Sequence, residues 1–168
     1  TTTRDIDPSN GDILSETDAA GNTRRFEYED GNHGLVAREI DAREYVIDHS
    51  DHDSFGNART LVGPAGRVVT RVFDDRGRLL SETDNLGHQV LQVWDAFDRL
   101  VERRRVAGAG EDEVYSWEYF LDGQKRAETN PLGARTEYFL DGLDRVVLEE
   151  TNLGPEMLTV QREHDANG

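Results

Sequence analysis

The chain has 168 residues with a net charge of −16, 35% hydrophobic residues and no cysteine. The lack of cysteine excludes disulfide bonds and thiol chemistry in these residues. The excess of carboxylates argues against nucleic acids and sulfated glycans as partners, because polyanions would be repelled over the whole surface. No apolar stretch approaches the length of a membrane span, and none has the form of a signal peptide.

One short phrase recurs along the chain. Residues 14–22 read LSETDAAGN and residues 80–88 read LSETDNLGH, and related phrases occupy residues 128–134 and 150–156. With two further glycines the series is Gly21, Gly66, Gly87, Gly110, Gly133 and Gly154. This spacing predicts a repeat of about 22 residues. One repeat, near position 43, has a divergent sequence, DAREY.

A second phrase alternates with the first: an aromatic or large residue, Asp, two or three spacers, a turn former, Arg and an apolar residue. It recurs at residues 28–36, 52–59, 73–79, 94–100, 121–126 and 140–146. Asp, Asn and Gly tolerate the left-handed backbone of tight turns, and an Asp carboxylate can accept the backbone N–H two residues on. The predicted turn residues are Asp30, Asp53, Asp74, Gly77, Gly87, Asp95, Asp122, Gly123, Gly133, Asp141 and Gly142.

The runs between these turns are short and rich in β-formers, for example VLQVWD at residues 90–95. No segment keeps the apolar spacing that a helix of three turns would need. Apolar and polar residues alternate only in part, which is typical of a sheet whose two faces both contact other material. The sequence therefore predicts an all-β chain, residues 1–168, built as a single array of about seven hairpin repeats.

Charged residues mark the hairpins. The strongest hairpin signals are Asn10-Gly11, Asp30-Gly31, Asp122-Gly123 and Asp141-Gly142. The arginines that follow turns are placed to pair with cross-strand carboxylates; they are Arg78, Arg99, Arg126 and Arg145. The segment Arg103–Tyr115, RRRVAGAGEDEVY, predicts a longer hairpin folded at Gly108–Gly110, with Arg103–Arg105 opposite Glu111–Glu113. A phosphate-binding basic patch is the less favoured interpretation of this segment.

The densest group of potential metal ligands is DHSDHD at residues 48–53. In a regular strand His49, Asp51 and Asp53 would share one face, as N and O ligands of a metal ion. The favoured interpretation is that His52 and Asp53 fill the aromatic-Asp position of the repeat. No serine lies in a nucleophile elbow, and the histidines form no constellation. We therefore predict no enzyme activity, no cofactor and no metal, with His49, Asp51 and Asp53 as weak metal candidates.

Aromatic residues recur at fixed places in the repeats. They are Tyr28, Phe73, Trp94, Tyr119, Phe120, Tyr138 and Phe139. In a repeat protein such residues usually pack one unit against the next, and exposed ones can stack on sugars. We favour packing.

Two segments of the chain resemble the repeat of a known family. Phe73–Leu100, FDDRGRLLSETDNLGHQVLQVWDAFDRL, strongly resembles the YD repeat of the Rhs (rearrangement hotspot) family, and Glu128–Val146 is a second match. The match is degenerate in places. Trp94, Leu121 and Leu140 replace the usual Tyr, and Asp98, Lys125 and Asp144 stand where Gly is usual.

The resemblance implies a curved, spiralling sheet of hairpins, a solenoid or shell segment. In Rhs polymorphic toxins and Tc toxin complexes such a shell encloses a toxic C-terminal domain, and in teneurins it serves adhesion. The nearest string to the family's self-cleavage motif is DPSNG at residues 7–11, at the wrong end and with the wrong spacing. No catalytic residue is therefore carried over.

The function that this implies is structural and non-catalytic: a segment of an Rhs-type β-shell that encloses a toxin or effector cargo. The alternative is an extracellular adhesion or glycan-binding YD-repeat module. The expected partners are flanking repeats of the same shell, the enclosed C-terminal toxin domain, and further copies that pair through strand edges. We expect the chain to be a fragment of a longer shell, secreted or delivered to the cell exterior.

Overall fold

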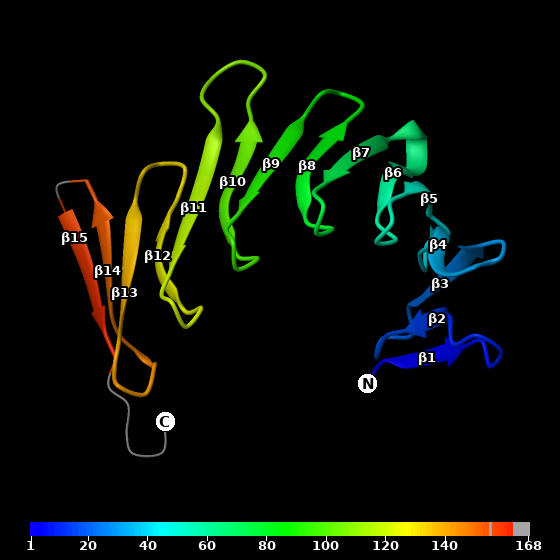
Figure 1. Ribbon diagram of the computed structural model, residues 1–168, viewed down its shortest axis with the longest axis horizontal. Coiled ribbons are helices and arrows are strands. Elements are labelled where there is room, and N and C mark those ends of the chain that lie inside the picture. The colour runs from blue at the N-terminus through cyan, green and yellow to red at the C-terminus, as the bar shows by residue number, and fades with distance from the viewer. Residues whose placement is uncertain (155, 163–168) are drawn as a thin grey trace. The chain divides into compact units, whose positions relative to one another are not determined.

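The computed structural model describes residues 1–154 and 156–162, which form fifteen β-strands (Figure 1). In this part of the chain there is no α-helix, and the other regular element is one turn of 3-10 helix, η1, Pro64–Gly66. Short β-prone runs interrupted by Gly and Asp favour strands over helices, so the predicted all-β class is confirmed. The closing phrase HDANG, residues 164–168, lies outside the described residues.

The chain divides into two compact units, Thr1–His88 and Gln89–Gly168. The strands of the first unit are β1 (Thr3–Ile6), β2 (Ile13–Thr17), β3 (Thr23–Glu29), β4 (Asn32–Ile40), β5 (Val46–His52), β6 (Ala58–Val62), β7 (Val68–Phe73) and β8 (Leu79–Asp84). The strands of the second unit are β9 (Gln89–Trp94), β10 (Leu100–Val106), β11 (Glu113–Tyr119), β12 (Lys125–Thr129), β13 (Arg135–Leu140), β14 (Val146–Leu153) and β15 (Glu156–Gln161).

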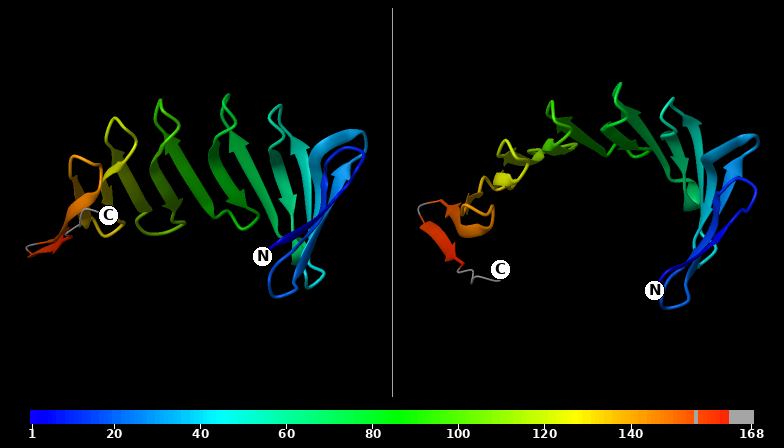
Figure 2. Two further views of the ribbon diagram at one scale, coloured as in Figure 1. Left: turned by 90° about the horizontal axis from the view of Figure 1, so that it is seen from below. Right: turned by 60° about the horizontal axis from the view of Figure 1, so that its bottom comes forward.

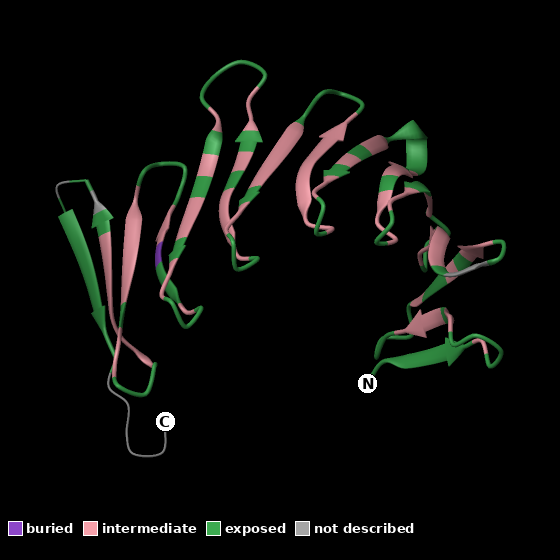
Figure 3. Cartoon of the chain, in the orientation of Figure 1, coloured by how far each residue is buried: buried purple, intermediate pink, exposed green. Residues whose placement is uncertain are grey.

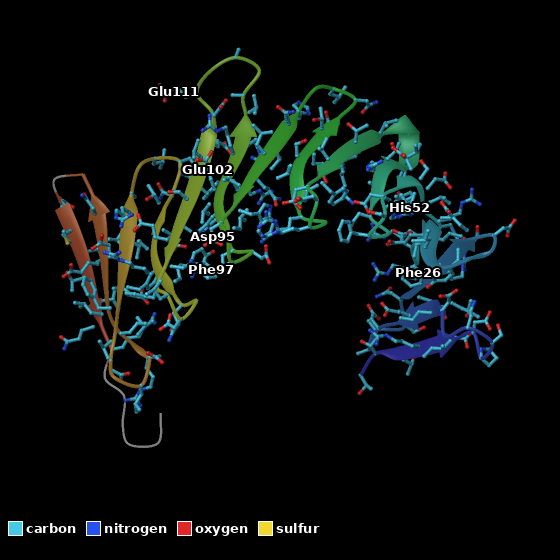
Figure 4. The ribbon with its side chains drawn as sticks, in the orientation of Figure 1. Phe26, His52, Asp95, Phe97, Glu102 and Glu111 are labelled. Carbon is cyan, nitrogen blue, oxygen red and sulfur yellow. The ribbon has the colours of Figure 1, made fainter. Side chains whose placement is uncertain are left out.

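In each unit every strand pairs antiparallel with its neighbours in the sequence, and the strands lie side by side in chain order (Figure 2). Short connections join them at alternate ends. In Figure 4, Asp95 and Phe97 lie at the β9–β10 turn, and Glu111 lies in the loop at the other end of β10. Each unit is thus a run of hairpins in which a strand contacts its immediate neighbours.

Irregular pairing recurs where a strand meets its second-phrase turn. The register shifts beside Tyr28, Phe73, Leu100, Tyr119 and Leu140. A β-bulge leaves one residue unpaired, bends the strand and increases its right-handed twist. The irregularities at Tyr28, Phe73 and Leu140 therefore coincide with the aromatic or large residue of the phrase, and the one at Leu100 lies opposite Trp94.

The described residues form no conventional core. Ala127 on β12 is fully buried, and most other strand residues are half-buried (Figure 3). Ala127 lies in register between Glu118 and Glu137, and the Arg135 guanidinium binds both of these carboxylates, at 2.7 and 3.0 Å. The long side chains of this ion-paired group cover the Ala127 methyl group, because charged side chains can shield apolar surface with their aliphatic stems.

The predicted long hairpin at residues 103–115 is confirmed, since β10 pairs with β11. Its predicted register was wrong in part. Arg105 is opposite Glu113, but Arg104 is opposite Val114 and Arg103 is opposite Tyr115. The predicted cross-strand ion pairs form for Arg105 with Glu113 at 3.0 Å and for Arg104 with Asp112 at 3.5 Å. The loop is wide enough that Glu111 lies beyond the paired part of the hairpin.

Two glycines of the second unit make a matched test of the turns. Gly133 has a φ of 78°, whereas Gly142 lies outside the left-handed region, and neither would place a new Cβ within 4 Å of another residue. We expect Gly133→Ala to lower the free energy of unfolding by about 1 kcal/mol, because an L-residue is disfavoured at this φ. Gly142→Ala should be neutral or slightly stabilising. Urea unfolding of both variants measures the difference, and equal effects would contradict the assigned turn geometry.

Candidate functional surface

A single turn geometry recurs at both ends of the strands. In a five-residue turn, the backbone N–H of the first residue donates to the carbonyl of the fifth, and the N–H of the fourth donates to the carbonyl of the first. The first side chain accepts the N–H groups of the third and fifth residues at 2.8–3.1 Å. The turns begin at Asp18, Asp41, Asp53, Asp74, Asp84, Asp95, Asn130 and Asp141.

The fourth residue of each of these turns has a left-handed backbone. Gly is usual there, but three acidic residues take the same place, namely Glu44, Asp98 and Asp144 with φ of 63°, 63° and 61°. This is the three-residue hairpin loop in which a left-handed residue closes a type I turn. The turn at residues 41–45 is the differently written DAREY phrase, so that phrase keeps the geometry without the glycine.

The turn residues predicted from the sequence take five different places. Asp53, Asp74, Asp95 and Asp141 open turns, and Gly77, Gly87 and Gly133 occupy the left-handed fourth position. Asp30 and Gly31 form the tight β3–β4 connection. Asp122 and Gly123 are the third and fourth residues of a turn that Phe120 opens, and Gly142 is the second residue of the Asp141 turn.

The arginines that end second-phrase turns clamp their own turns. Arg78 binds Asp74, Arg99 binds Asp95 and Arg145 binds Asp141, with nitrogen–oxygen distances of 2.7, 2.7 and 2.8 Å. The sequence prediction had placed these arginines opposite cross-strand carboxylates. The turn instead brings the first and fifth side chains together, which makes the nearer partner the aspartate four residues earlier.

Arg99 also links two successive turns. Its guanidinium lies over the Phe97 ring at 5.2 Å and over the Tyr119 ring at 4.8 Å. Nη1 donates to the Phe120 carbonyl at 2.7 Å, and the Tyr119 hydroxyl donates to the Leu100 carbonyl at 2.8 Å. The Tyr28 hydroxyl makes the same type of contact with the Ile13 carbonyl at 2.8 Å. The hydroxyl groups of Tyr28 and Tyr119 therefore each tie their strand to the preceding strand.

Charged side chains on the strands pair within the sheet. Arg4, Glu16, Arg24 and Glu39 form a continuous chain of ion pairs across β1 to β4, at 2.7, 3.2 and 3.2 Å. The strands contain 17 acidic and 12 basic residues, whereas the rest of the chain contains 18 acidic and 7 basic residues. Most of the negative charge therefore belongs to residues outside the strands.

The weak metal candidates separate in the structure. The Asp53 carboxylate accepts the backbone N–H groups of Phe55 and Asn57 in its own turn. Asp51 has a left-handed backbone with a φ of 56°, which breaks the alternation of the strand, and its Oδ1 lies 3.8 Å from Arg59 Nη1. His49 and His52 instead line one cavity of about 340 Å³. Burial lowers the pKa of His49, whose Nε2 has no hydrogen-bond partner. Among the described residues, no three His, Cys, Asp or Glu side chains are grouped as metal ligands.

The aspartate turns are expected to make the protein sensitive to acid. The backbone N–H and then the side chain of Arg145 lower the pKa of Asp141 from 3.8 to about 2. Because the folded-state pKa lies below the unfolded value, this stabilisation is complete above pH 3.8 and is lost as the pH falls towards 2. We expect Asp141→Asn to reduce stability at neutral pH and to match the wild type below about pH 2. Urea midpoints measured from pH 7 to pH 2 test this, and a constant difference across that range would contradict it.

Strands paired in chain order, aspartate-opened turns and arginine clamps define a tandem β-hairpin repeat protein. Residues 73–109 match the RHS Repeat family model. Residues 73–109 therefore match the Rhs repeat, which bears out the predicted resemblance to the Rhs or YD-repeat family for this segment.

Two curated proteins are similar to this chain over most of its length. The chain is 28% identical over 145 residues to Probable deoxyribonuclease RhsB of Dickeya dadantii (strain 3937), a match that covers 86% of this chain and 10% of the relative. It is 26% identical over 147 residues to Probable deoxyribonuclease RhsA of the same organism, with the same two coverages. The chain thus spans about a tenth of the length of these relatives.

Solved structures share the fold. The crystal structure of TcdB2-TccC3-Cdc42 superposes with a TM-score of 0.72 at 18% identity, over 99% of this chain and 10% of that one. The structure of the Photorhabdus luminescens Tc holotoxin pore gives a TM-score of 0.64 at 16% identity, over 98% of this chain and 11% of that one. In the described part of this chain, no helix is long and apolar enough to span a membrane.

Proposed function

We propose that this chain is a segment of the wall of an Rhs-type β-shell, whose work is to enclose a toxin or effector domain. The observation that carries the proposal is that the sheet satisfies its own backbone hydrogen bonds and most of its charges without a second layer packed on it. Within each unit every strand pairs with its sequence neighbours, and most charged side chains on the strands find partners within the sheet. Such a sheet needs no second layer, which suits a thin wall with material on both sides.

The mechanism is steric. Adjacent strands of a sheet lie about 4.8 Å apart with their backbone groups bonded to each other, so no polypeptide can pass between them. The aspartate turns close the ends of the hairpins with short, fully bonded loops. A protease, which must bind its substrate as an extended chain, is kept from whatever lies behind the wall.

Flanking repeats are the proposed partners along the array. The strands β1 and β15 are exposed along their whole length (Figure 3). An open strand edge pairs readily with another strand. Further hairpins of the same shell would continue the ladder at both edges, and the single array of about seven repeats is proposed to be part of a longer, spiralling sheet that is delivered to the cell exterior.

The wall itself is proposed to be non-catalytic. The relatives named as probable deoxyribonucleases are about ten times longer than the matched segment. In the proposed arrangement their nuclease chemistry belongs to an enclosed domain, and this segment contributes enclosure alone. The enclosed domain is the second proposed partner.

Protease protection of the enclosed domain tests the proposal. In the full-length polypeptide, the C-terminal domain should resist proteinase K while the wall is intact. Ser116→Pro, which removes a donor from the central strand β11, should make that domain cleavable, whereas Ser116→Thr should leave it protected. Equal protection in both variants, or cleavage of the domain in the wild type, would overturn the proposal.

A further inference from the structure

A shallow groove crosses one face of the second unit, from β10 to β14. It consists of two adjoining cavities of about 220 and 250 Å³, which share Tyr115 and Trp117. The first cavity is completed by Arg103, Arg105 and Glu113. The second is completed by Glu128, Thr129, Asn130, Ala134, Thr136 and Thr151. We name this feature the Arg103 groove.

The centre of the groove is aromatic. Tyr115 and Trp117 are two apart on β11 and therefore project from the same face. Their rings are parallel to within 10°, with centroids 6.3 Å apart, and Tyr115 is 42% exposed. A pair of aligned rings offers a surface on which a third ring can stack.

One end of the groove is cationic. Arg103 lies in register between Gln92 on β9 and Tyr115 on β11, both of which are uncharged. Its neighbour Arg104 forms ion pairs with Glu102 and Asp112. Its neighbour Arg105 forms an ion pair with Glu113. No ion pair or hydrogen bond of the Arg103 side chain is recorded among the described residues. An exposed guanidinium with its full set of donors is a ready partner for a carboxylate.

The other end of the groove offers no competing negative charge. Glu128, the acidic residue there, accepts hydrogen bonds from Lys125 at 2.7 Å and from the Tyr138 hydroxyl at 2.9 Å. Thr136 and Thr151 bond to each other through their hydroxyls at 2.8 Å. The groove therefore runs from an available cation, across two rings, to neutralised and hydroxyl-bearing groups.

We infer that the Arg103 groove binds a peptide segment in which an aromatic side chain adjoins a glutamate or aspartate. The ring stacks beside Tyr115 and Trp117, and the carboxylate forms a forked contact with Arg103. Local charge selects this occupant, because Arg104 and Arg105 are paired with carboxylates and Arg103 is not.

The source of the peptide rests on the proposed function: it is a segment of the enclosed polypeptide. A tethered partner reaches an effective concentration of about 1 mM, so a dissociation constant of about 1 mM suffices to hold it. The groove would then orient the cargo against the wall.

Nuclear magnetic resonance titration of the 168-residue chain tests the inference. The probe is the blocked dipeptide N-acetyl-Trp-Glu-amide, and its matched control is N-acetyl-Trp-Gln-amide. We expect the Trp-Glu peptide to shift the amide signals of β10 and β11 with a dissociation constant of about 1 mM, and the Trp-Gln peptide to bind at least fivefold more weakly.

Two arginine variants make the assignment specific. Arg103→Gln should remove the preference for Trp-Glu. Arg126→Gln, which changes an exposed strand arginine that does not line the groove, should keep it. The dispersion of amide signals reports whether each variant is folded.

Three results would overturn the inference: no shifts in β10 and β11, equal affinity for the two peptides, or an unchanged preference in Arg103→Gln. Binding of cellohexaose in place of the peptide would also overturn it and would favour the glycan-binding alternative. The protease test of the wall does not depend on Arg103, so a failed titration leaves the wall proposal standing, and a failed protease test removes only the assigned source of the peptide.

Discussion

Proline at Ser116 is expected to lower the free energy of unfolding by about 1–3 kcal/mol for the lost ladder hydrogen bond, with the clash of its ring adding to this loss. Ser116 lies in the middle of β11, opposite Glu102 on β10 and Thr129 on β12. A strand bonded on both sides uses every backbone N–H, so proline both removes a ladder hydrogen bond and places its ring against a neighbouring strand. No buried core offsets the loss, because Ala127 alone is fully buried among the described residues.

The damage should also be local. In an array where each strand contacts its neighbours, stability is carried by successive interfaces. Amide hydrogen exchange should therefore accelerate in β10, β11 and β12 of Ser116→Pro and remain near the wild-type rate in β2, β3 and β4. Ser116→Thr is the control, since threonine suits a strand. Uniform acceleration through both units would show a single cooperative domain and would contradict the hairpin-by-hairpin account.

Arg99→Ala is expected to cost about 2–3 kcal/mol. The substitution removes the Asp95 clamp at 2.7 Å, the hydrogen bond to the Phe120 carbonyl at 2.7 Å and two cation–aromatic contacts. The side chain of Arg99 is 22% exposed, so these contacts are partly shielded from solvent. The loss should be larger than for an ordinary surface ion pair, which contributes about 0–1 kcal/mol.

Arg99→Lys separates charge from shape. Lysine keeps the positive charge but lacks the planar fork, and it should recover less than half of the lost stability. Urea unfolding of the two variants beside Arg105→Ala, which loses an exposed ion pair with Glu113, provides the comparison. If Arg99→Ala and Arg105→Ala cost the same, Arg99 does not link successive turns.

Much of the fold was predictable because local chemistry decides it. An Asp followed three residues later by Gly, as at Asp74 and Gly77, can be satisfied by one turn geometry with a capped first residue and a left-handed fourth residue. Short β-prone runs between such turns can pair with their neighbours at little loop cost. The all-β class and the hairpin order follow from these two facts.

The exact turn register was not predictable from the phrase alone. The string YFLDG occurs at Tyr119–Gly123 and at Tyr138–Gly142, yet the first copy opens its turn at Phe120 and the second at Asp141. In the first copy Gly123 takes the left-handed place. In the second, Asp144 takes it, and Arg145 clamps Asp141. The residues after the phrase make the choice, so identical pentapeptides adopt different turns.

The Arg103 groove could not be predicted from the sequence for a related reason, namely the register of the strands. Charge symmetry predicted Arg103–Arg105 opposite Glu111–Glu113, but the loop at residues 107–112 sets the register and places Tyr115 opposite Arg103. A shift of pairing decides which side chains meet across a sheet. The exposed ring of Tyr115, the half-buried ring of Trp117 and an uncompensated arginine then share a face, which neither the charge pattern nor the repeat spacing indicated.

A cryo-electron microscopy map of the full-length polypeptide tests the central claim most directly. The account predicts that residues 1–168 continue at β1 and β15 into further hairpins of one closed wall, with density for a separate domain inside it. An open sheet with solvent on both faces and no enclosed domain would contradict the account and would make an adhesion or binding module the better description.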